Sequence, residues 1–303
     1  MASTSSPADD TVPTPACETP AQVQEALRAH DYIADRGLAT AMSLALTLAV
    51  PLLVEGEPGV GKTELARALA TATGRRLLRL QCYEGIDAAS ALYEWDYARQ
   101  LLHIKATAEG ETPDDTTVFT ERFLLERPLL AALRAGDGCV LLIDEVDRAD
   151  EAFEAFLLEF LSDFQITIPE LGTVRALSSP VVVLTSNRTR ELHDALRRRC
   201  LFHWIDYPTP EQERTIVGLR VPGLDPRLVH EVTEVVNRLR ELDLDKVPGV
   251  SETILWARAL AALGLTRLDE ESVTATVGAL LKDQDDVERV LAMRVALVDE
   301  PDR

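Results

Sequence analysis

This sequence of 303 residues has few cysteines and no long apolar run. Its four cysteines, Cys17, Cys82, Cys139 and Cys200, form no C-x-x-C pair, so we expect neither a disulfide framework nor a zinc site. No uninterrupted apolar run reaches the roughly 18 residues that a bilayer-spanning helix needs. The sequence therefore predicts no membrane span.

The sequence also lacks an excess of basic residues. It has 31 Lys and Arg against 51 Asp and Glu, a formal net charge of −20. Because phosphate contacts need clustered basic side chains, this charge disfavours a nucleic-acid partner. A local basic channel is left as an alternative. Residues 1–20 are rich in Ser, Thr, Pro and Ala and lack the basic and apolar regions of a signal peptide. We expect a disordered tail there, and a cytoplasmic protein.

What is present suits a globular chain of about two domains. Apolar runs typical of buried strands alternate with helical patterns as far as Pro208, which predicts a parallel α/β sheet. We expect a first domain over 21–208, with Gly37 breaking the helical run 21–49, and an all-helical domain over 209–303. Strands are expected at 50–54, 76–82, 138–143, 181–184 and 201–205, and helices of the second domain at 210–220, 226–242, 251–264, 270–282 and 285–297.

Two segments interrupt the first domain. Residues 93–104 contain an aromatic group, Tyr93, Trp95 and Tyr97, and favour an exposed element such as a hairpin. That element either contacts a client protein or packs against its own domain. Residues 165–176, with alternating apolar positions around Gly172, predict a short hairpin.

The clearest motif is G-x-x-x-x-G-K-T, between an apolar run and a helical run. Glycines let successive backbone N–H groups turn inward as a cradle, and the following helix adds its positive N-terminal end. Lys62 then reaches the β- and γ-phosphates, and the Thr63 hydroxyl binds Mg²⁺. An ordinary glycine-rich turn does not explain four fixed identities at this spacing. The predicted nucleoside triphosphate site comprises Gly56, Glu57, Pro58, Gly59, Val60, Gly61, Lys62, Thr63 and Glu64.

Two acids, Asp144 and Glu145, follow the apolar run 140–143. Ligands bind at the carboxyl ends of strands in open α/β sheets, so both acids are expected beside the phosphates. Asp144 is the candidate Mg²⁺ ligand, and Glu145 the candidate base for in-line attack of water on the γ-phosphate. A plain pair of surface acids is the alternative.

Two further polar groups follow later strands. Asn187 ends the run 183–186 and could hold the attacking water with Glu145, although such residues are often simple helix caps. Three successive arginines stand at 197–199, where a guanidinium could reach the γ-phosphate of a neighbouring subunit. For at least one of the three we favour a solvated basic patch. No N-K-x-D guanine motif is present nearby, so adenine is the expected base.

In this order the motifs resemble those of AAA+ ATPases over roughly residues 21–300. The inserts at 93–104 and 165–176 resemble those of the MoxR branch. The segment 184–208 resembles the subgroup similar to CoxD, which is associated with maturation of molybdenum-containing carbon monoxide dehydrogenases. The resemblance implies a P-loop AAA+ core with a central parallel sheet, followed by a small helical lid.

The resemblance also assigns roles. It makes Asp144 and Glu145 the Walker B pair after the Walker A loop 56–63, and Asn187 the residue called sensor 1. It makes Arg199 the arginine finger, with Arg198 in reserve. It implies a homo-oligomer, a hexameric ring with ATP between subunits, and a partner that carries a von Willebrand factor A domain.

The chain departs from the family pattern at Thr253, where many relatives carry the sensor-2 arginine. Either Arg258 substitutes from the next helical turn, or this lid responds to nucleotide differently.

The expected function is an ATP-hydrolysing, chaperone-like motor that remodels a client metalloenzyme or matures its metal centre. A slowly hydrolysing assembly scaffold is the first alternative, and a nucleic-acid motor is the second. The histidines show no metal-ligand spacing, so ATP and Mg²⁺ are the only cofactors expected.

Overall fold

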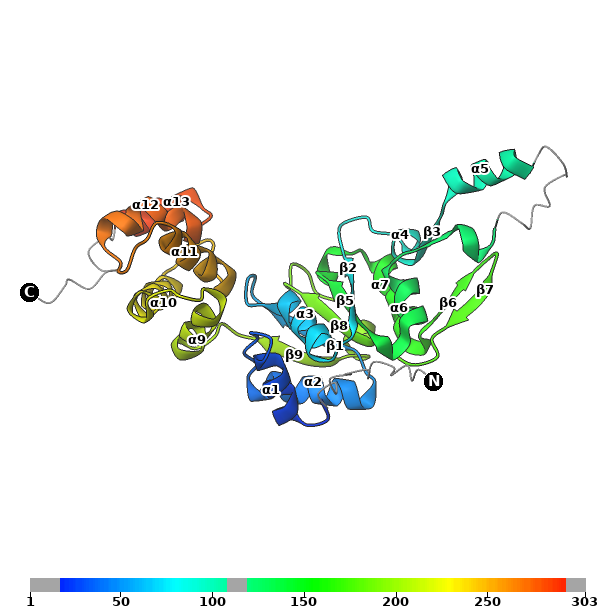
Figure 1. Cartoon of the computed structure of the whole chain (residues 1–303), viewed down its shortest axis with the longest axis horizontal. Helices are drawn as coiled ribbons and strands as arrows, with labels where there is room; N and C mark the ends of the chain where they lie inside the picture. Colours follow the sequence, from blue (N-terminus) through cyan, green and yellow to red (C-terminus); the bar gives the residue numbers. More distant parts are fainter. Residues whose placement is uncertain (1–16, 108–118, 293–303) are drawn as a thin grey trace, which may run out of the picture.

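The computed structural model describes residues 17–107 and 119–292, which form an α/β part followed by a helical part (Figure 1). Of the tail predicted for residues 1–20, residues 1–16 lie outside the described part, and α1 (Pro20–Arg28) begins at its end. No helix among the described residues is both long and apolar enough to cross a bilayer.

Five parallel strands form the main sheet, in the order β2-β5-β8-β1-β9. Neighbouring strands are therefore far apart in the sequence, as expected when helices connect parallel strands. This arrangement confirms the predicted α/β fold with a central parallel sheet. The strands are β1 (Leu52–Gly56), β2 (Arg76–Gln81), β5 (Cys139–Asp144), β8 (Val181–Ser186) and β9 (Leu201–Ile205).

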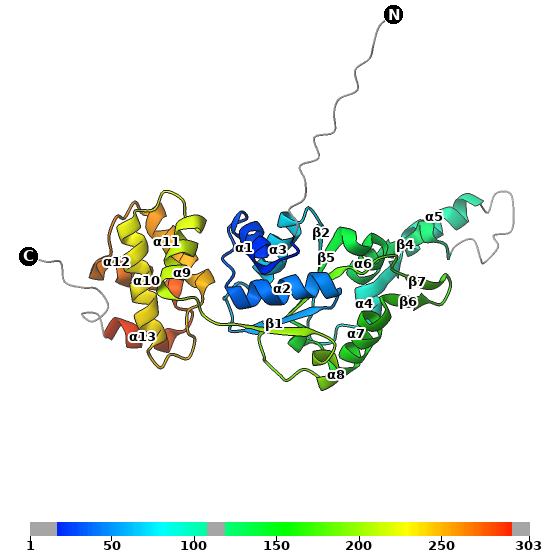
Figure 2. The same ribbon diagram turned by 90° about the horizontal axis from the view of Figure 1, so that it is seen from below.

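Helices cover both faces of this sheet (Figure 2). Because side chains alternate along a strand, Leu52 and Val54 join a core with α1, α2 (Arg36–Leu48) and α3 (Lys62–Ala72). Leu53 joins the opposite core with α6 (Pro128–Ala135) and α7 (Glu151–Asp163). Short elements complete this part: α4 (Ala88–Leu92), α8 (Asp194–Arg197), η2 (Glu121–Phe123), η3 (Gly136–Gly138) and η4 (Val146–Arg148).

The predicted helix break at Gly37 is wrong. The chain leaves helical geometry between α1 and α2, and Gly37 lies in the first turn of α2. The Asp35 carboxylate accepts a hydrogen bond from the Leu38 N–H at 2.6 Å and so starts that helix before the glycine. A Cβ at position 37 would come within 3.2 Å of His203 Cε1, so the glycine serves close packing there.

The hairpin suggested for 93–104 is also wrong. Residues Tyr93–Trp95 form β3, but its antiparallel partner is the distant β4 (Leu124–Glu126). Asp96 then accepts from the Arg99 N–H at 2.9 Å and caps α5 (Tyr97–Thr107), which projects from the end opposite the helical part (Figure 1). The second insert is the predicted hairpin, β6 (Gln165–Ile168) paired with β7 (Gly172–Arg175).

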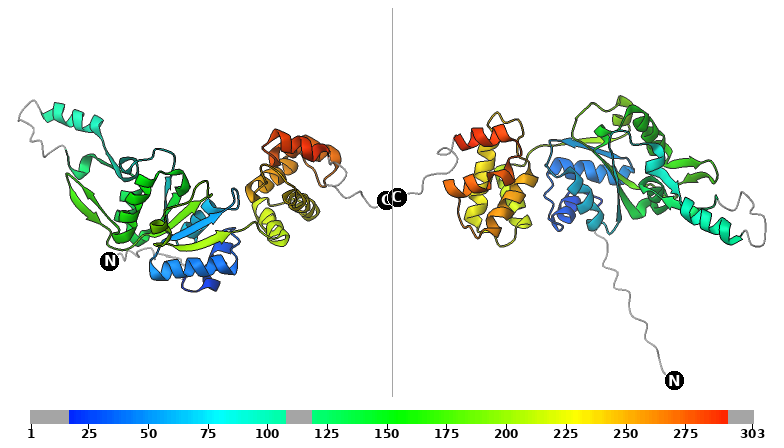
Figure 3. Two further views of the ribbon diagram at one scale, coloured as in Figure 1. Left: turned by 180° about the vertical axis from the view of Figure 1, so that it is seen from behind. Right: turned by 90° about the horizontal axis from the view of Figure 1, so that it is seen from above.

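Between β9 and residue 292 the chain forms five helices, which follow the predicted positions. The helices lie together beside the α/β part (Figure 3). They surround a separate core in which Trp256 is fully buried. The end predicted for the last helix, at 297, lies outside the described residues. The helices are α9 (Pro210–Arg220), α10 (Pro226–Arg240), α11 (Val250–Ala262), α12 (Glu270–Leu280) and α13 (Gln284–Ala292). We call this part the lid.

Candidate nucleotide site

The glycine-rich loop joins the end of β1 to the start of α3, as the motif predicts. Gly59 and Gly61 have φ values of +77° and +97°, a region that side chains rarely adopt, so the loop requires glycine at both positions. Gly61 is also the N-cap of α3 and makes no side-chain cap, so the first N–H groups of the helix are available to an anion.

Lys62 folds back over this loop. Its side chain is buried, and Nζ donates to the carbonyl oxygens of Gly56 and Glu57, both at 2.7 Å. An ammonium has three donors, so these two bonds leave one for a ligand. Burial lowers the pKa of Lys62, and the nearby carboxylates of Asp147 and Glu57 oppose that shift. The loop therefore holds a positive charge where phosphates are expected.

The two groups predicted to bind Mg²⁺ lie in contact. Thr63 Oγ1 is 3.0 and 3.2 Å from the two carboxylate oxygens of Asp144, at the end of β5. Thr185 Oγ1, on the adjacent β8, donates to Asp144 Oδ1 at 2.5 Å. Asp144 is only 1% exposed, so its orientation is set by these bonds. A hydroxyl and a carboxylate are ligands that Mg²⁺ accepts, and the residues present fit that ion.

Arg79 reaches the same carboxylate and was missed by sequence reasoning. Its Nε and Nη2 lie 2.9 and 2.6 Å from Asp144 Oδ2. Arg79 belongs to β2, which pairs with β5 so that Gln81 lies beside Asp144. The expected strand 76–82 contained this arginine, but only the strand order brings it to Asp144.

Glu145 leaves the strand direction at once, with φ +53° and ψ +50°. Its N–H donates to Thr185 Oγ1 at 2.9 Å, so one hydroxyl fixes both acids. Its carboxylate is partly exposed and pairs with Arg148 across 3.1 Å. Glu145 is thus accessible while Asp144 is buried, which suits a base beside a metal ligand.

Asn187 directly follows β8, and Asp147 of the turn η4, a second residue that sequence reasoning missed, holds it. The buried Asp147 accepts from the Asn187 N–H at 3.2 Å, and from the Thr189 N–H and hydroxyl at 2.8 and 2.7 Å. Asn187 also lines a polar pocket with Glu57 of the phosphate loop. Asp147 is the second acid after the end of β5 in the sequence, and that position was the available signal.

The three arginines at 197–199 differ from one another. Arg197 pairs with the buried carboxylate of Glu55 at 3.6 Å, and Arg188 approaches the same carboxylate at 3.7 Å. Arg198 and Arg199 are exposed, and Arg199 donates to the Ser162 hydroxyl of α7. Arg197 is therefore not part of the solvated patch expected for at least one of the three, because it pairs with an acid of its own chain.

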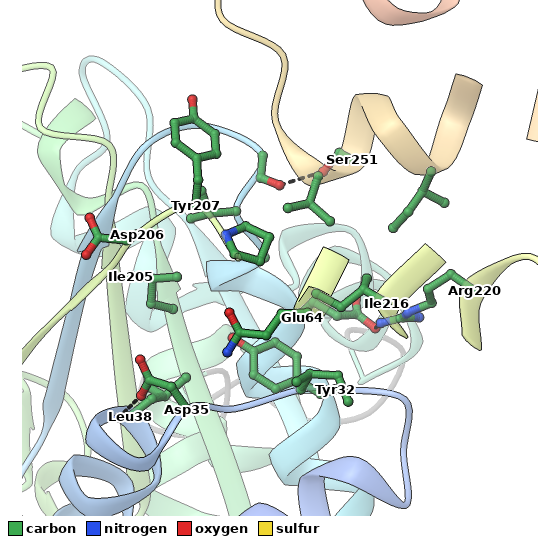
Figure 4. Close-up of a pocket in the computed structure, with 18 of the residues that line it drawn as sticks. Tyr32, Asp35, Leu38, Glu64, Ile205, Asp206, Tyr207, Ile216, Arg220 and Ser251 are labelled. Carbon is green, nitrogen blue, oxygen red and sulfur yellow. Dashed lines mark hydrogen bonds and ion pairs between the residues drawn. The ribbon is translucent and has the colours of Figure 1, made fainter. Parts of the chain in front are cut away.

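A cavity of about 380 Å³ adjoins the phosphate loop (Figure 4). It lies between the segment before α2, the end of β9 and the lid, and its size suits a small ligand. Neither Arg198 nor Arg199 lines it. Tyr32 is a buried residue in the wall of this cavity, and burial raises the pKa of its phenol. The polar lining residues include Asp35, Gln212, Arg220, Ser251 and Arg258.

The lid touches the loop directly. Ser251 donates its backbone N–H and its hydroxyl to the Gly59 carbonyl, both at 3.2 Å (Figure 4). A Cβ at Gly249 would lie 2.7 Å from the Pro58 carbonyl oxygen, so only glycine permits this approach. Arg220 of α9 also pairs with Glu64 of α3 across 2.7 Å.

The residue at the family's sensor-2 position, Thr253, does not face the cavity. Thr253 is fully buried inside the lid, where its hydroxyl donates to Glu213 at 2.8 Å. Glu213 also forms a buried ion pair with Arg240. Arg258 does line the cavity, and its Nη2 lies 3.4 Å from the Arg220 carbonyl oxygen. Two lid arginines, Arg220 and Arg258, therefore line the cavity, whereas position 253 does not.

A phosphate loop, a buried strand-end acid and a helical lid define a P-loop AAA+ protein. Residues 51–200 match the AAA domain of the dynein-related subfamily. The chain is 27% identical to protein NorQ of Paracoccus denitrificans, covering 77% of this chain and 81% of NorQ. It is 25% identical to protein CbbQ of Hydrogenophilus thermoluteolus, and the similarity covers 82% of this chain and 86% of CbbQ. It is also 25% identical to denitrification regulatory protein NirQ of Stutzerimonas stutzeri, and the similarity covers 72% of this chain and 74% of NirQ.

Residues 51–200 are an AAA domain, and the MoxR-type AAA+ character expected from the motifs is confirmed by the similarity to NorQ, CbbQ and NirQ. The finer resemblance to the subgroup similar to CoxD stays a prediction.

Proposed function

We propose that this chain hydrolyses ATP with Mg²⁺ at a site that a second copy completes. One arrangement carries the proposal: the Thr63 hydroxyl meets the Asp144 carboxylate, with Lys62 over the loop. Thr63 and Asp144 would hold Mg²⁺, which when bound neutralises charge on the phosphate oxygens. The cavity beside the loop would take the adenosine part.

The residues divide the chemistry among them. Lys62 and the loop N–H groups bind the phosphates. Glu145 accepts a proton from the attacking water, and Asn187 orients that water from the next strand. Arg199, or Arg198 in reserve, would come from the neighbouring copy and stabilise charge on the γ-phosphate. That arrangement requires an oligomer, and a hexameric ring is the form the family implies.

The work done by hydrolysis is the remodelling or maturation of a client protein. The net charge of −20 disfavours a nucleic-acid substrate, because polyanions are repelled. The similar NirQ is named a denitrification regulatory protein, which agrees with action on another enzyme system. We propose a cytoplasmic motor whose client is a metalloenzyme, with a molybdenum hydroxylase as the specific candidate and a von Willebrand factor A protein as adaptor.

The decisive experiment measures phosphate release from ATP by the full chain and its Glu145→Gln variant. We expect turnover to fall about 10³-fold with ATP binding kept, because only the base is lost. Glu151→Gln, an exposed acid on α7, is the matched control and should change nothing. Turnover that survives Glu145→Gln would remove Glu145 as the base.

The alternatives give other outcomes. A scaffold would assemble on ATP addition, seen as a mass change, with turnover near zero in the unmodified chain. A nucleic-acid motor would bind DNA with strong salt dependence.

A further inference from the structure

Asp144 receives more hydrogen bonds than its orientation needs. Oδ1 accepts from Thr63 and Thr185, which already fix the carboxylate from two neighbouring elements. Oδ2 accepts a further pair of bonds from Arg79, at 2.9 and 2.6 Å. The Asp144 carboxylate therefore accepts hydrogen bonds from the Arg79 guanidinium in addition to two hydroxyls.

A guanidinium is not required to hold a buried acid at this edge of the sheet. Asp147, three residues later and equally buried, is held by two N–H groups and one hydroxyl. The cation at Asp144 thus needs a reason other than fixing the carboxylate. The Asp144 side chain is 2% exposed and that of Arg79 is 48% exposed, so the arginine stands on the solvent side of the acid.

We infer that Arg79 is a positioning residue that occupies Asp144 until Mg²⁺ arrives with a nucleotide. This inference rests on the proposed function. A positive charge in contact with Asp144 repels a divalent cation that approaches the same carboxylate, so free Mg²⁺ binds poorly. A bound triphosphate supplies negative charge that offsets this repulsion. Metal then enters as part of the nucleotide complex, and the arginine is free to turn outward.

Gln81 supports this position. Its side-chain oxygen accepts from Arg79 Nη2, and Gln81 lies beside Asp144 in the strand register. The guanidinium is therefore held at one place by two acceptors, yet it remains half exposed and can leave without opening the core.

The test uses the full chain, its Arg79→Gln and Arg79→Lys variants, and Arg76→Gln as control. Arg76 is an exposed arginine at the far end of β2. Mn²⁺ serves as the metal probe and is titrated without nucleotide by electron paramagnetic resonance. Binding of a fluorescent ADP analogue is then measured against Mg²⁺ concentration, and thermal melting confirms folding.

We expect Arg79→Gln to bind Mn²⁺ about tenfold more tightly without nucleotide, and to reach half-maximal ADP binding at about tenfold less Mg²⁺. Arg79→Lys keeps the charge and should stay near the unmodified chain, as should Arg76→Gln. Unchanged or weaker Mn²⁺ binding by Arg79→Gln would overturn the inference. If no variant binds ADP, the proposed function fails, while the Mn²⁺ titration still decides the role of Arg79.

Discussion

The phosphate loop and the arginine cluster at 197–199 lie at opposite ends of one sheet and are built differently, because the loop follows the end of β1 whereas the arginines precede the start of the parallel β9. Lys62 and Asp144 are buried and bonded to groups of their own chain. Arg198 and Arg199 are exposed and line no part of the cavity beside the loop. One region is preformed by the fold, whereas the other presents charge outward.

This difference explains why the chain would act as an oligomer. A buried charge must be paired inside the fold, so the loop side cannot depend on a neighbour for its stability. An exposed guanidinium costs little to keep ready, and it becomes useful when another copy brings a phosphate to it. Arg197 marks the boundary, because it pairs with Glu55 of its own chain.

The largest effect is expected for Lys62→Ala. Removal of the ammonium takes away the positive charge that the loop carbonyls hold, so ATP binding should fall by more than about 10²-fold and turnover should vanish. Isothermal titration with ATP measures the loss. Arg67→Ala on the same helix, where Arg67 forms an exposed pair with Glu64, is the control and should bind normally. Normal ATP binding by Lys62→Ala would contradict the assigned loop.

The next largest effect is expected for Arg199→Ala, which tests whether a neighbouring copy of the chain supplies an arginine to the site. Arg199→Ala should lower turnover about 10³-fold with ATP affinity nearly kept, because the proposed finger would act on transition-state charge. Mixing Arg199→Ala chains with Lys62→Ala chains should restore part of the activity, since some interfaces then combine an intact loop with an intact arginine. Phosphate release is measured against the mixing ratio. No recovery at any ratio would argue against an arginine acting between copies.

The smallest effect separates Arg197 from the other two arginines. Arg197→Ala leaves Glu55 with Arg188 alone and should lower the free energy of unfolding by about 1–2 kcal/mol, reduced by the partial exposure of the arginine. Urea denaturation measures this, and Arg198→Ala should stay within about 0.5 kcal/mol of the unmodified chain. Adding Glu55→Gln to Arg197→Ala should recover stability. Equal losses for Arg197→Ala and Arg198→Ala would erase the distinction.

Much of the site could be read from local pattern. The loop residues, Asp144 and Asn187 each follow a run of apolar residues, and the end of a buried strand is easy to recognise. The helix break at Gly37 failed because the Asp35 cap, and not the glycine, decides where α2 starts. The hairpin at 93–104 failed because the partner of β3 comes some 30 residues later, beyond the reach of local periodicity.

The sequence by itself determined the phosphate loop, because its function depends on backbone freedom and a helix end within eight consecutive residues. It also determined the family and the succession of the five main strands along the chain. Only the tertiary structure decided which cation meets which acid. Arg79 is 65 residues from Asp144 along the chain, and Arg197 stands still farther from Glu55. Those pairs exist because the tertiary fold brings them together, and charge attraction at 2.6 and 3.6 Å depends on that placement alone.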